Sequence, residues 1–395
     1  MKTLIKNAVI VDKDTIAKSE ILIENGLISK VADQIQTDSD TTIIDAKNKT
    51  VMPAFVDLHV HFRDPGFTYK EDLQTGSKSA VKGGYTTVNL MANTNPICDS
   101  EEKHKDIITR AEKIGLVDIY QAVAVTENFD ATTVVDYSKL STKLLSDDGK
   151  GVPSDVVMYH ALKKAKENDK LIMVHAESEL SKIDYRYAED LITMRDLYLA
   201  EKLGAPIHFC HVSTIDAVKA IQKAKEKGVK VTCEIAPHHI SLYDLNYRVN
   251  PPIRSKTDVQ ALIEAVKLGV VDTIGTDHAP HTEEDKENGA PGMVGLETAF
   301  CVSYTSLVKN NGVDIRKLSE LLSYGGAKIL GINKGLIKQG YEADLVIVDT
   351  EKEITVDPST FASKSKNTPF AGKKYYGQIL ATIKKGEIKY KEENF

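Results

Sequence analysis

Between residues 54 and 277 the chain repeats one unit, in which an apolar run is followed by a turn and an amphipathic helical pattern. Eight apolar runs predict strands, at residues 54–61, 85–91, 117–125, 142–147, 171–175, 207–211, 229–235 and 272–277. Helical patterns lie between most of them, at residues 103–114, 154–167, 191–203, 215–227 and 258–268. Strands joined through helices run parallel, so eight units favour a closed (β/α)₈ TIM barrel with its active site at the C-terminal strand ends. An open doubly wound sheet is the alternative, but no glycine-rich phosphate loop follows any of the runs.

The hydrophobic pattern at the two ends of the chain differs from the strand–helix repeat of the middle. Residues 1–53 contain short apolar segments separated by polar residues, with an Asn25-Gly26 turn signal between two of them. This pattern predicts a small antiparallel β unit. Residues 315–330 are helical, and short strands return at 344–348, 353–356, 378–383 and 388–390. We expect the ends, residues 1–53 and 336–395, to pair into one small discontinuous β-sandwich domain beside a metal-dependent barrel at 54–335.

Composition excludes several classes of protein. With a net charge of −6 over 395 residues, the chain lacks the excess positive charge that binding to nucleic acid or an anionic membrane requires. No signal peptide and no apolar run of bilayer length is found in the sequence, so we expect a cytoplasmic protein. The four cysteines, Cys98, Cys210, Cys233 and Cys301, are far apart, which is typical of reduced core residues and not of a disulfide framework or thiolate zinc site.

Polar residues stand at the ends of the predicted strands, where a barrel would gather them into one mouth. A single histidine at a strand end is more often structural than metal-binding, but here four imidazoles and two carboxylates recur at matching places. The candidate metal ligands are His59, His61, Asp148, His175, His211 and Asp277. Imidazole and carboxylate without thiolate suit Zn²⁺, with Mn²⁺, Co²⁺ or Fe²⁺ remaining open. Six ligands exceed the three that one catalytic zinc needs, which predicts two ions and a water activated between them.

The residue that bridges the two ions has three candidates. The fourth strand ends with Asp147 and Asp148, and we favour Asp148 as the bridge. A carbamylated lysine is the alternative, for which Lys143 is the nearest candidate.

Eight segments together resemble the dihydroorotase family of the amidohydrolase superfamily, in the branch with an aspartate at the bridge. They are residues 57–66, 93–96, 146–149, 210–214, 237–239, 250–254, 276–282 and 365–370. The resemblance implies two zinc ions and reversible closure of N-carbamoyl-L-aspartate to L-dihydroorotate in pyrimidine biosynthesis. It also implies a homodimer, with an aspartate transcarbamoylase as a candidate partner.

The resemblance further implies a role for each site residue. His59, His61 and Asp277 would hold one metal, and His175 and His211 the other, with Asp148 between them. Asp277 would also carry a proton from the attacking water to the leaving ring nitrogen. The remaining residues would bind substrate. Arg63, Asn93 and His281 would bind its carboxylate, Asn250 would contact the ring amide, and Pro291 and Gly292 would contact the substrate from a nearby loop. Two of these have simpler interpretations, since Arg63 could pair with Asp64 and His281 could bind a backbone carbonyl.

Some features depart from the family pattern. The segment between His175 and His211 and the segment 241–249 are short, Ala92 replaces a common proline, and Pro291 replaces a common phenylalanine. Two competing functions remain: another cyclic amidohydrolase of the dihydropyrimidinase or allantoinase type, and an inactive scaffold paralogue that partners a transcarbamoylase. The first usually carries a bridging lysine, and the second should have lost metal ligands.

Overall fold

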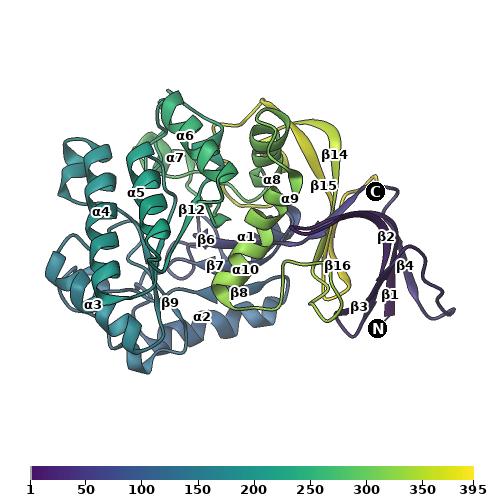
Figure 1. Ribbon diagram of the computed structural model, residues 1–395, viewed down its shortest axis with the longest axis horizontal. Helices are drawn as coiled ribbons and strands as arrows, with labels where there is room; N and C mark the ends of the chain where they lie inside the picture. The colour runs from purple at the N-terminus through teal and green to yellow at the C-terminus, as the bar shows by residue number, and fades with distance from the viewer. Residues whose placement is uncertain (1) are drawn as a thin grey trace.

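A closed ring of eight parallel strands forms the middle of the chain in the computed structural model, which describes residues 2–395 (Figure 1). The strands are β6 (Phe55–Val60), β7 (Tyr85–Leu90), β8 (Asp118–Gln121), β9 (Leu144–Leu145), β10 (Leu171–Val174), β11 (Ile207–Phe209), β12 (Val231–Ile235) and β13 (Thr273–Ile274). Two parallel segments, β6-β7-β8 and β9-β10-β11-β12-β13, are joined by bridges between Val123 and Leu145 and between Val60 and His278. The predicted barrel is therefore confirmed.

Helices cover the outside of the barrel. They are α1 (Leu73–Lys82), α2 (Glu101–Ile114), α3 (Asp155–Glu167), α4 (Tyr185–Leu203), α5 (Ile215–Glu226), α6 (Lys256–Lys267), α8 (Ala299–Ser303), α9 (Ile315–Ser319) and α10 (Gly325–Leu330), with α7 (Glu283–Glu287) in a loop. π-Helical turns at Tyr304–Lys309 and Glu320–Tyr324 connect the last of them, and 3₁₀ turns occupy Glu127–Phe129, Tyr137–Lys139, Glu179–Lys182, Pro237–Ile240 and Pro358–Thr360. No helix within residues 2–395 combines the length and the apolar character that crossing a bilayer requires.

Helix α4 starts six residues before its predicted start. Asp184 caps it, because its carboxylate accepts a hydrogen bond from the backbone N–H of Arg186. Its first turns also bury Glu189 and Asp190, whose carboxylates bind the backbone and hydroxyl groups of Ser213 and Thr214. Buried acidic residues break the apolar period that a helical prediction relies on.

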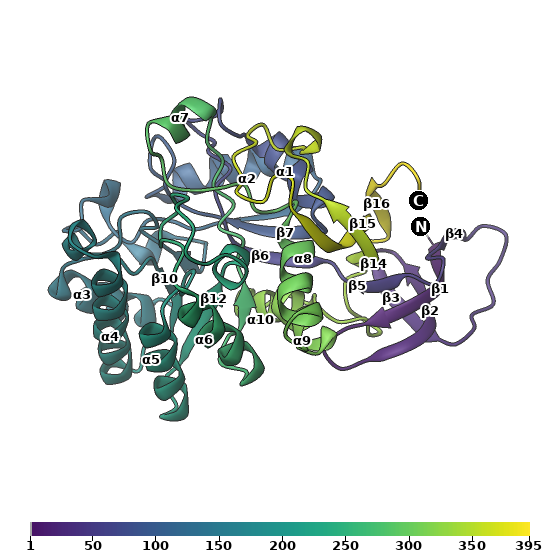
Figure 2. The ribbon, with the colours of Figure 1, turned by 90° about the horizontal axis from the view of Figure 1, so that it is seen from above.

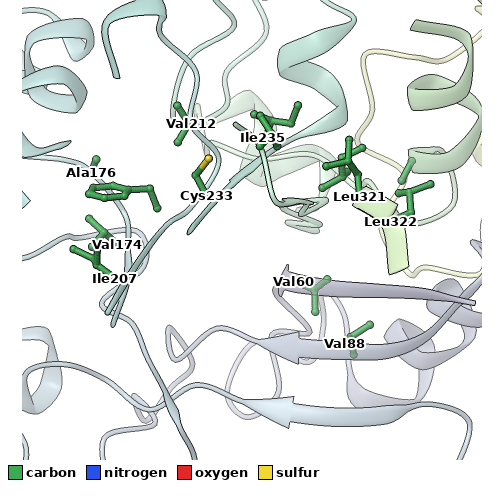
Figure 3. Close-up of a cluster of buried hydrophobic side chains, with 14 of the residues drawn as sticks. Val60, Val88, Val174, Ala176, Ile207, Val212, Cys233, Ile235, Leu321 and Leu322 are labelled. Atoms are coloured by element: carbon green, nitrogen blue, oxygen red, sulfur yellow. The ribbon is translucent and has the colours of Figure 1, made fainter. Parts of the chain in front are cut away.

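The core of the barrel lies between its strands and its helices (Figure 3). Val60 and Val88 contribute from one side of the ring and Ile207 and Ile235 from the other. A fully buried aliphatic side chain of this size contributes roughly 1.5–3 kcal/mol relative to its exposed state. All four cysteines are buried free thiols, as the sequence predicts.

The chain ends form one eight-stranded sheet, which lies beside the barrel (Figure 2). Its strands are β1 (Lys2–Val11), β2 (Ile16–Glu24), β3 (Leu27–Ala32), β4 (Thr42–Asp45), β5 (Thr50–Pro53), β14 (Leu345–Thr355), β15 (Lys374–Lys384) and β16 (Glu387–Lys391). Antiparallel pairing of β5 with β14, with Val51 opposite Ile347, joins the two ends of the chain.

Two expectations for this sheet are wrong in detail. The N-terminal unit is not purely antiparallel, because β1 pairs in parallel with both β4 and β5. The crossover segment after β3 is long enough to bring the chain back in the same direction. The two strands expected at 344–348 and 353–356 form one strand, β14, with an irregularity between Asp349 and Glu353.

A buried ion cluster joins the sheet to the barrel. Nζ of Lys334 lies 2.7 Å from Asp344 and 2.9 Å from the hydroxyl of Thr87, and it also pairs with Asp118. Burial acts to lower the pKa of Lys334, but the charges of Asp344 and Asp118 outweigh burial and raise it. The ammonium therefore stays charged and holds β7, β8 and the chain before β14 together.

Candidate metal centre

The six expected metal ligands converge at the C-terminal ends of the barrel strands, around the carboxylate of Asp148. Its Oδ1 lies 3.3 Å from Nε2 of His59, 3.2 Å from Nδ1 of His175 and 3.5 Å from Nε2 of His211. Its Oδ2 lies 3.4 Å from Nε2 of His61. One carboxylate thus faces four imidazoles contributed by three separate strand ends.

Asp277 completes the cluster from the end of β13. Its Oδ1 lies 3.2 Å from Nε2 of His61 and 3.6 Å from Nε2 of His59. The ligand atoms form two compact groups, His59 with His61 and Asp277, and His59 with Asp148 and His211. Atoms in each group lie within 4.8 Å of one another, a spacing that a shared cation can span.

Both carboxylates are held in the ionised form. Burial acts to raise the pKa of Asp148, but the charge of His59 and the close approach of the His175 and His211 rings outweigh burial and hold the pKa well below the usual range. The pKa of Asp277 is also lowered, because its hydrogen bond with His61 and the charges of His59 and His61 outweigh the opposing effect of burial. Ionised oxygens are the form in which carboxylates bind metals.

Hydrogen bonds at the outer ring nitrogens orient three of the imidazoles. Nδ1 of His59 lies 2.7 Å from Oε1 of Glu234, and Nδ1 of His61 lies 2.8 Å from Oδ1 of Asn93. Nε2 of His175 lies 2.8 Å from Oε2 of Glu177. When each ring is neutral with its proton on the outer nitrogen, the lone pair of the inner nitrogen points into the cluster, which is the arrangement that metal-binding histidines use.

The donor set fits a metal ion by a second observation. Among the described residues, Nε2 of His59 and Oδ1 of Asp148 are buried and have no hydrogen-bond partner. Buried polar atoms without a partner cost about 1–3 kcal/mol, and these two face each other inside the cluster. A cation between them would satisfy both.

The structure distinguishes the three candidates for the bridge. Asp147 points away from the imidazoles and accepts hydrogen bonds from the backbone of Val125 and Thr126. Lys143 is largely exposed and pairs with Asp169 at 3.2 Å, before the start of β9, so the lysine alternative is wrong. Among the candidates, only Asp148 lies among the ligands.

A cavity of about 210 Å³ opens beside this cluster. All six residues expected to touch substrate line it, namely Arg63, Asn93, Asn250, His281, Pro291 and Gly292. One wall of the cavity is formed by candidate metal ligands, namely His61, Asp148, His175 and Asp277. The residues expected to bind substrate and the candidate metal ligands therefore line the same cavity.

The guanidinium of Arg63 is fixed at one side of this cavity. Nε donates to the carbonyl of Pro280 at 3.2 Å, and Nη2 lies 3.2 Å from Nε2 of His281. The simpler interpretation of Arg63 as a surface partner of Asp64 is wrong, because Asp64 pairs with Arg110 at 2.6 Å.

His281 is neutral and lies between two cations. Burial together with the charges of Arg63 and Lys70 lowers the pKa of His281 to about 3. Its ring contacts Arg63 and Lys70, not the loop carbonyl that the simpler interpretation assigned to it. The cluster is rich in positive charge and suits an anionic group.

Gly292 cannot be replaced without strain. Its φ of +130° is a conformation that residues with a side chain rarely adopt, and a Cβ there would lie 2.7 Å from the Cβ of Ala279. The neighbouring Pro291 therefore leads into a backbone position that only glycine fills, at the edge of the cavity.

Sequence reasoning missed Glu234, Tyr185 and Lys70. Glu234 contacts His59 and His208, Tyr185 donates a hydrogen bond to Glu177 at 2.8 Å, and Lys70 contacts His281. The signal for Glu234 was present, since a carboxylate inside an otherwise apolar strand needs a buried partner. Its partner could not be identified from sequence, because His59 is 175 residues away.

Comparisons with known proteins agree with this geometry. The family model described as "Amidohydrolase family" matches residues 50–389. A dihydroorotase from Clostridium botulinum is 52% identical over 99% of this chain and 100% of its own, and one from Thermoanaerobacter is 40% identical over 100% and 98%. Among solved structures, an L-hydantoinase (dihydropyrimidinase) from Arthrobacter aurescens matches with a TM-score of 0.88 at 28% identity, covering 98% of this chain and 95% of that one.

Proposed function

Because the chain belongs to the amidohydrolase family and is similar to dihydroorotases along its whole length, we propose that it is a dihydroorotase. It interconverts N-carbamoyl-L-aspartate and L-dihydroorotate in de novo pyrimidine biosynthesis. The observation that carries the proposal is the cavity, in which a cationic clamp for a carboxylate lies opposite a cluster of ionised aspartates and oriented imidazoles.

The metal part of the proposal is two Zn²⁺ ions per chain. His59, His61 and Asp277 would hold one, His175 and His211 the other, and Asp148 would contact both. Three imidazoles whose outer nitrogens are already bonded, and two aspartates with lowered pKa values, support this assignment. When bound, the ions would polarise the ring carbonyl and lower the pKa of a water molecule, so that it can attack the carbonyl as hydroxide near neutral pH.

The protein's own groups position the substrate and move the proton. Arg63 binds the substrate carboxylate, with Asn93 and His281 beside it, and Asn250 contacts the ring amide. Asp277 takes a proton from the attacking water and delivers it to the ring nitrogen as the ring C–N bond breaks. In the synthetic direction the same carboxylate removes the proton from the ureido nitrogen. Pro291 and Gly292 close the cavity beside the ring.

A second candidate, hydrolysis of an uncharged cyclic amide, is favoured by the hydantoinase structures that the fold resembles. Two observations argue against it. An aspartate lies where those enzymes usually have a carbamylated lysine, and Arg63 brings to the cavity a positive charge that an uncharged ring does not need. An inactive scaffold is disfavoured as well, since all six candidate ligands are present and buried.

The proposal also covers the domain boundaries, the cellular location and the assembly of the enzyme. We assign residues 54–335 to the catalytic barrel, with residues 1–53 and 336–395 as the flanking domain, and the cytoplasm as its location. Four buried free thiols fit a reducing compartment. The assembly is proposed to be a homodimer, with an aspartate transcarbamoylase as a candidate partner.

A substrate comparison tests the function. Zinc-loaded protein is assayed with L-dihydroorotate and with the same dihydropyrimidine ring lacking the carboxylate. The proposal expects turnover of the first, with kcat/KM at least about 10-fold above the second, because a charge-assisted carboxylate contact is worth about 1.5–3 kcal/mol. A preference for the uncharged ring would replace this function with the second candidate.

A further inference from the structure

A second cavity, which we call the lower cavity, has a volume of about 530 Å³ and lies at the N-terminal ends of barrel strands. Lys143 and Lys170, the residues just before β9 and β10, contribute polar groups to its wall. Ile119 of β8, Leu171 of β10 and Leu330 of α10 contribute apolar ones. A cavity of this volume, with apolar walls and a few polar groups, is typical of small-molecule sites.

The lower cavity is separate from the catalytic one. Within residues 2–395, the side chains that line the two cavities are entirely different. Lys170 precedes β10 and His175 follows it, and five residues of extended strand span about 16 Å. The residues of the lower cavity therefore take no part in the proposed reaction.

The ammonium of Lys170 lies in this wall without a counter-ion. Lys170 is only 8% exposed, and its Nζ donates to the carbonyl oxygens of Leu140 at 2.6 Å and Thr142 at 2.7 Å. An ammonium has three N–H donors, so one is left for another partner. Burial lowers the pKa of Lys170, and the charges of Glu101 and Asp169 do not outweigh burial. The group lacks the close negative partner that a buried charge needs.

A second ammonium adds positive charge at the same place. The charge of Lys143 also acts to lower the pKa of Lys170, as expected for two cations that lie near each other. Asp169, the carboxylate in this wall, has a side chain that is 90% exposed and pairs with Lys143 at 3.2 Å. An exposed pair of this kind is weak and leaves the buried ammonium uncompensated. An anion bound between the two lysines would supply the missing charge.

Two residues of the wall also have unmet hydrogen bonds. Nδ1 of His104 and Oε1 of Gln121 are buried and have no hydrogen-bond partner among the described residues. Oε2 of Glu101 lies 4.0 Å from Nδ1 of His104, which is beyond hydrogen-bond distance. Buried polar atoms without a partner are rare in folded proteins, and a polar ligand is one way to satisfy them.

We propose that the lower cavity is a binding site for a small organic anion with an apolar body. The anionic group lies between Lys143 and Lys170, and the body packs against Ile119, Leu171 and Leu330. The apolar wall disfavours a bare inorganic anion, and the two ammonium groups disfavour an uncharged apolar compound. The proposal does not rest on the reaction, so its failure would leave the enzymatic assignment unaffected.

A matched pair of fluorescent probes tests this site. Anilinonaphthalene sulfonate carries an anionic group, and phenylnaphthylamine is the same ring system without it. Both fluoresce more strongly in apolar surroundings, and the chain has no tryptophan to interfere. Titration of the wild type should show one saturable site that binds the sulfonate at least about 10-fold more tightly than the uncharged probe. Equal affinities, or no saturable binding of the sulfonate, would overturn the proposal.

Substitutions at the two lysines locate the probe. Lys170→Met should weaken the sulfonate about 10-fold or more and leave the uncharged probe unaffected. Lys143→Glu should weaken the sulfonate about 5-fold or more, and this variant should fold normally because the Lys143 side chain is 65% exposed. Lys163→Glu is the matched control, since Lys163 is exposed on α3 and lies outside the lower cavity. Unchanged sulfonate binding by Lys143→Glu would contradict the site.

Arg63→Met distinguishes the two cavities. It removes a cation from the catalytic cavity only, so the affinity for the sulfonate should equal that of the wild type. Weakened binding by Arg63→Met, together with normal binding by Lys143→Glu, would place the probe in the catalytic cavity and overturn the proposal.

Discussion

Oε1 of Glu234 lies 2.7 Å from Nδ1 of His59, and neither side chain is accessible to solvent. The carboxylate sits on β12 and the imidazole on β6, so the contact crosses the interior of the barrel. Oε2 of Glu234 also lies 3.3 Å from Nε2 of His208. Glu234 therefore has both oxygens engaged and directs Nε2 of His59 toward Asp148.

Replacing this carboxylate should loosen the metal centre. Glu234→Gln keeps the shape but removes the negative charge that favours a proton on Nδ1 of His59. Loss of such outer partners typically costs 10–100-fold in metal affinity. Chelator competition with metal content read by elemental analysis measures the change. Glu226→Gln, an exposed glutamate at the end of α5, should bind metal like the wild type. Equal retention by the two variants would remove Glu234 from the proposed centre.

Removing the guanidinium of Arg63 should damage substrate binding selectively. Arg63→Met should raise KM for dihydroorotate by about 10–100-fold, since one charge-assisted contact is lost. The uncharged ring without a carboxylate should be hydrolysed no less efficiently than by the wild type. Steady-state kinetics on both substrates separate the outcomes, and an unchanged KM for dihydroorotate would contradict the clamp.

The ion cluster between the barrel and the sheet should matter for stability. Lys334→Met leaves the buried carboxylate of Asp344 without its cation, while Asp118 keeps Lys384, and breaking a buried pair in this way costs about 3–5 kcal/mol. Urea denaturation followed by circular dichroism measures the loss. Lys374→Met is the control, because Lys374 makes only an exposed pair with Glu353 and should change stability by about 0.5 kcal/mol or less.

Asp196 should make stability depend on pH. It is fully buried in α4, Oδ2 has no partner among the described residues, and burial raises the pKa of its carboxyl from 3.8 to about 6. The unfolded chain then binds fewer protons than the folded chain between about pH 4 and 6, so this group makes folding less favourable as pH rises through that window. The penalty reaches about 3 kcal/mol above pH 6 and vanishes below pH 4.

Asp196→Asn removes this titration. The difference in unfolding free energy between the variant and the wild type should shift by about 3 kcal/mol in favour of the variant from pH 4 to pH 7. Constant costs of the substitution cancel in that comparison. A difference that stays flat with pH would show that Asp196 keeps an ordinary pKa.

The sequence predicts the barrel well because its signal is local and repeated. Apolar runs and helical periods each span a few residues, and β6, β7 and β10 begin and end within one residue of their predicted bounds. β9 and β13 are only two residues long, although six were expected in each. After each of these short strands the chain leaves the sheet, and the segment that follows places Asp148 or Asp277 in the site.

The site is predictable in its residue types and less so in its contacts. Which of Asp147 and Asp148 faces the imidazoles depends on how the chain after β9 meets Val125 and Thr126, and that register is not local. Likewise, the antiparallel expectation for residues 1–53 failed because β1 pairs with β4 and β5, which lie more than thirty residues along the chain.

The most direct test of the account is dihydroorotate hydrolysis measured together with metal content, in wild type and Asp277→Asn. Chelated wild type should be inactive and should regain turnover as it takes up two zinc ions per chain. Metal-loaded Asp277→Asn should lose about 10²–10⁴-fold in kcat, because the proton carrier is gone. Full activity without metal, or no turnover by wild type carrying two zinc ions, would contradict it.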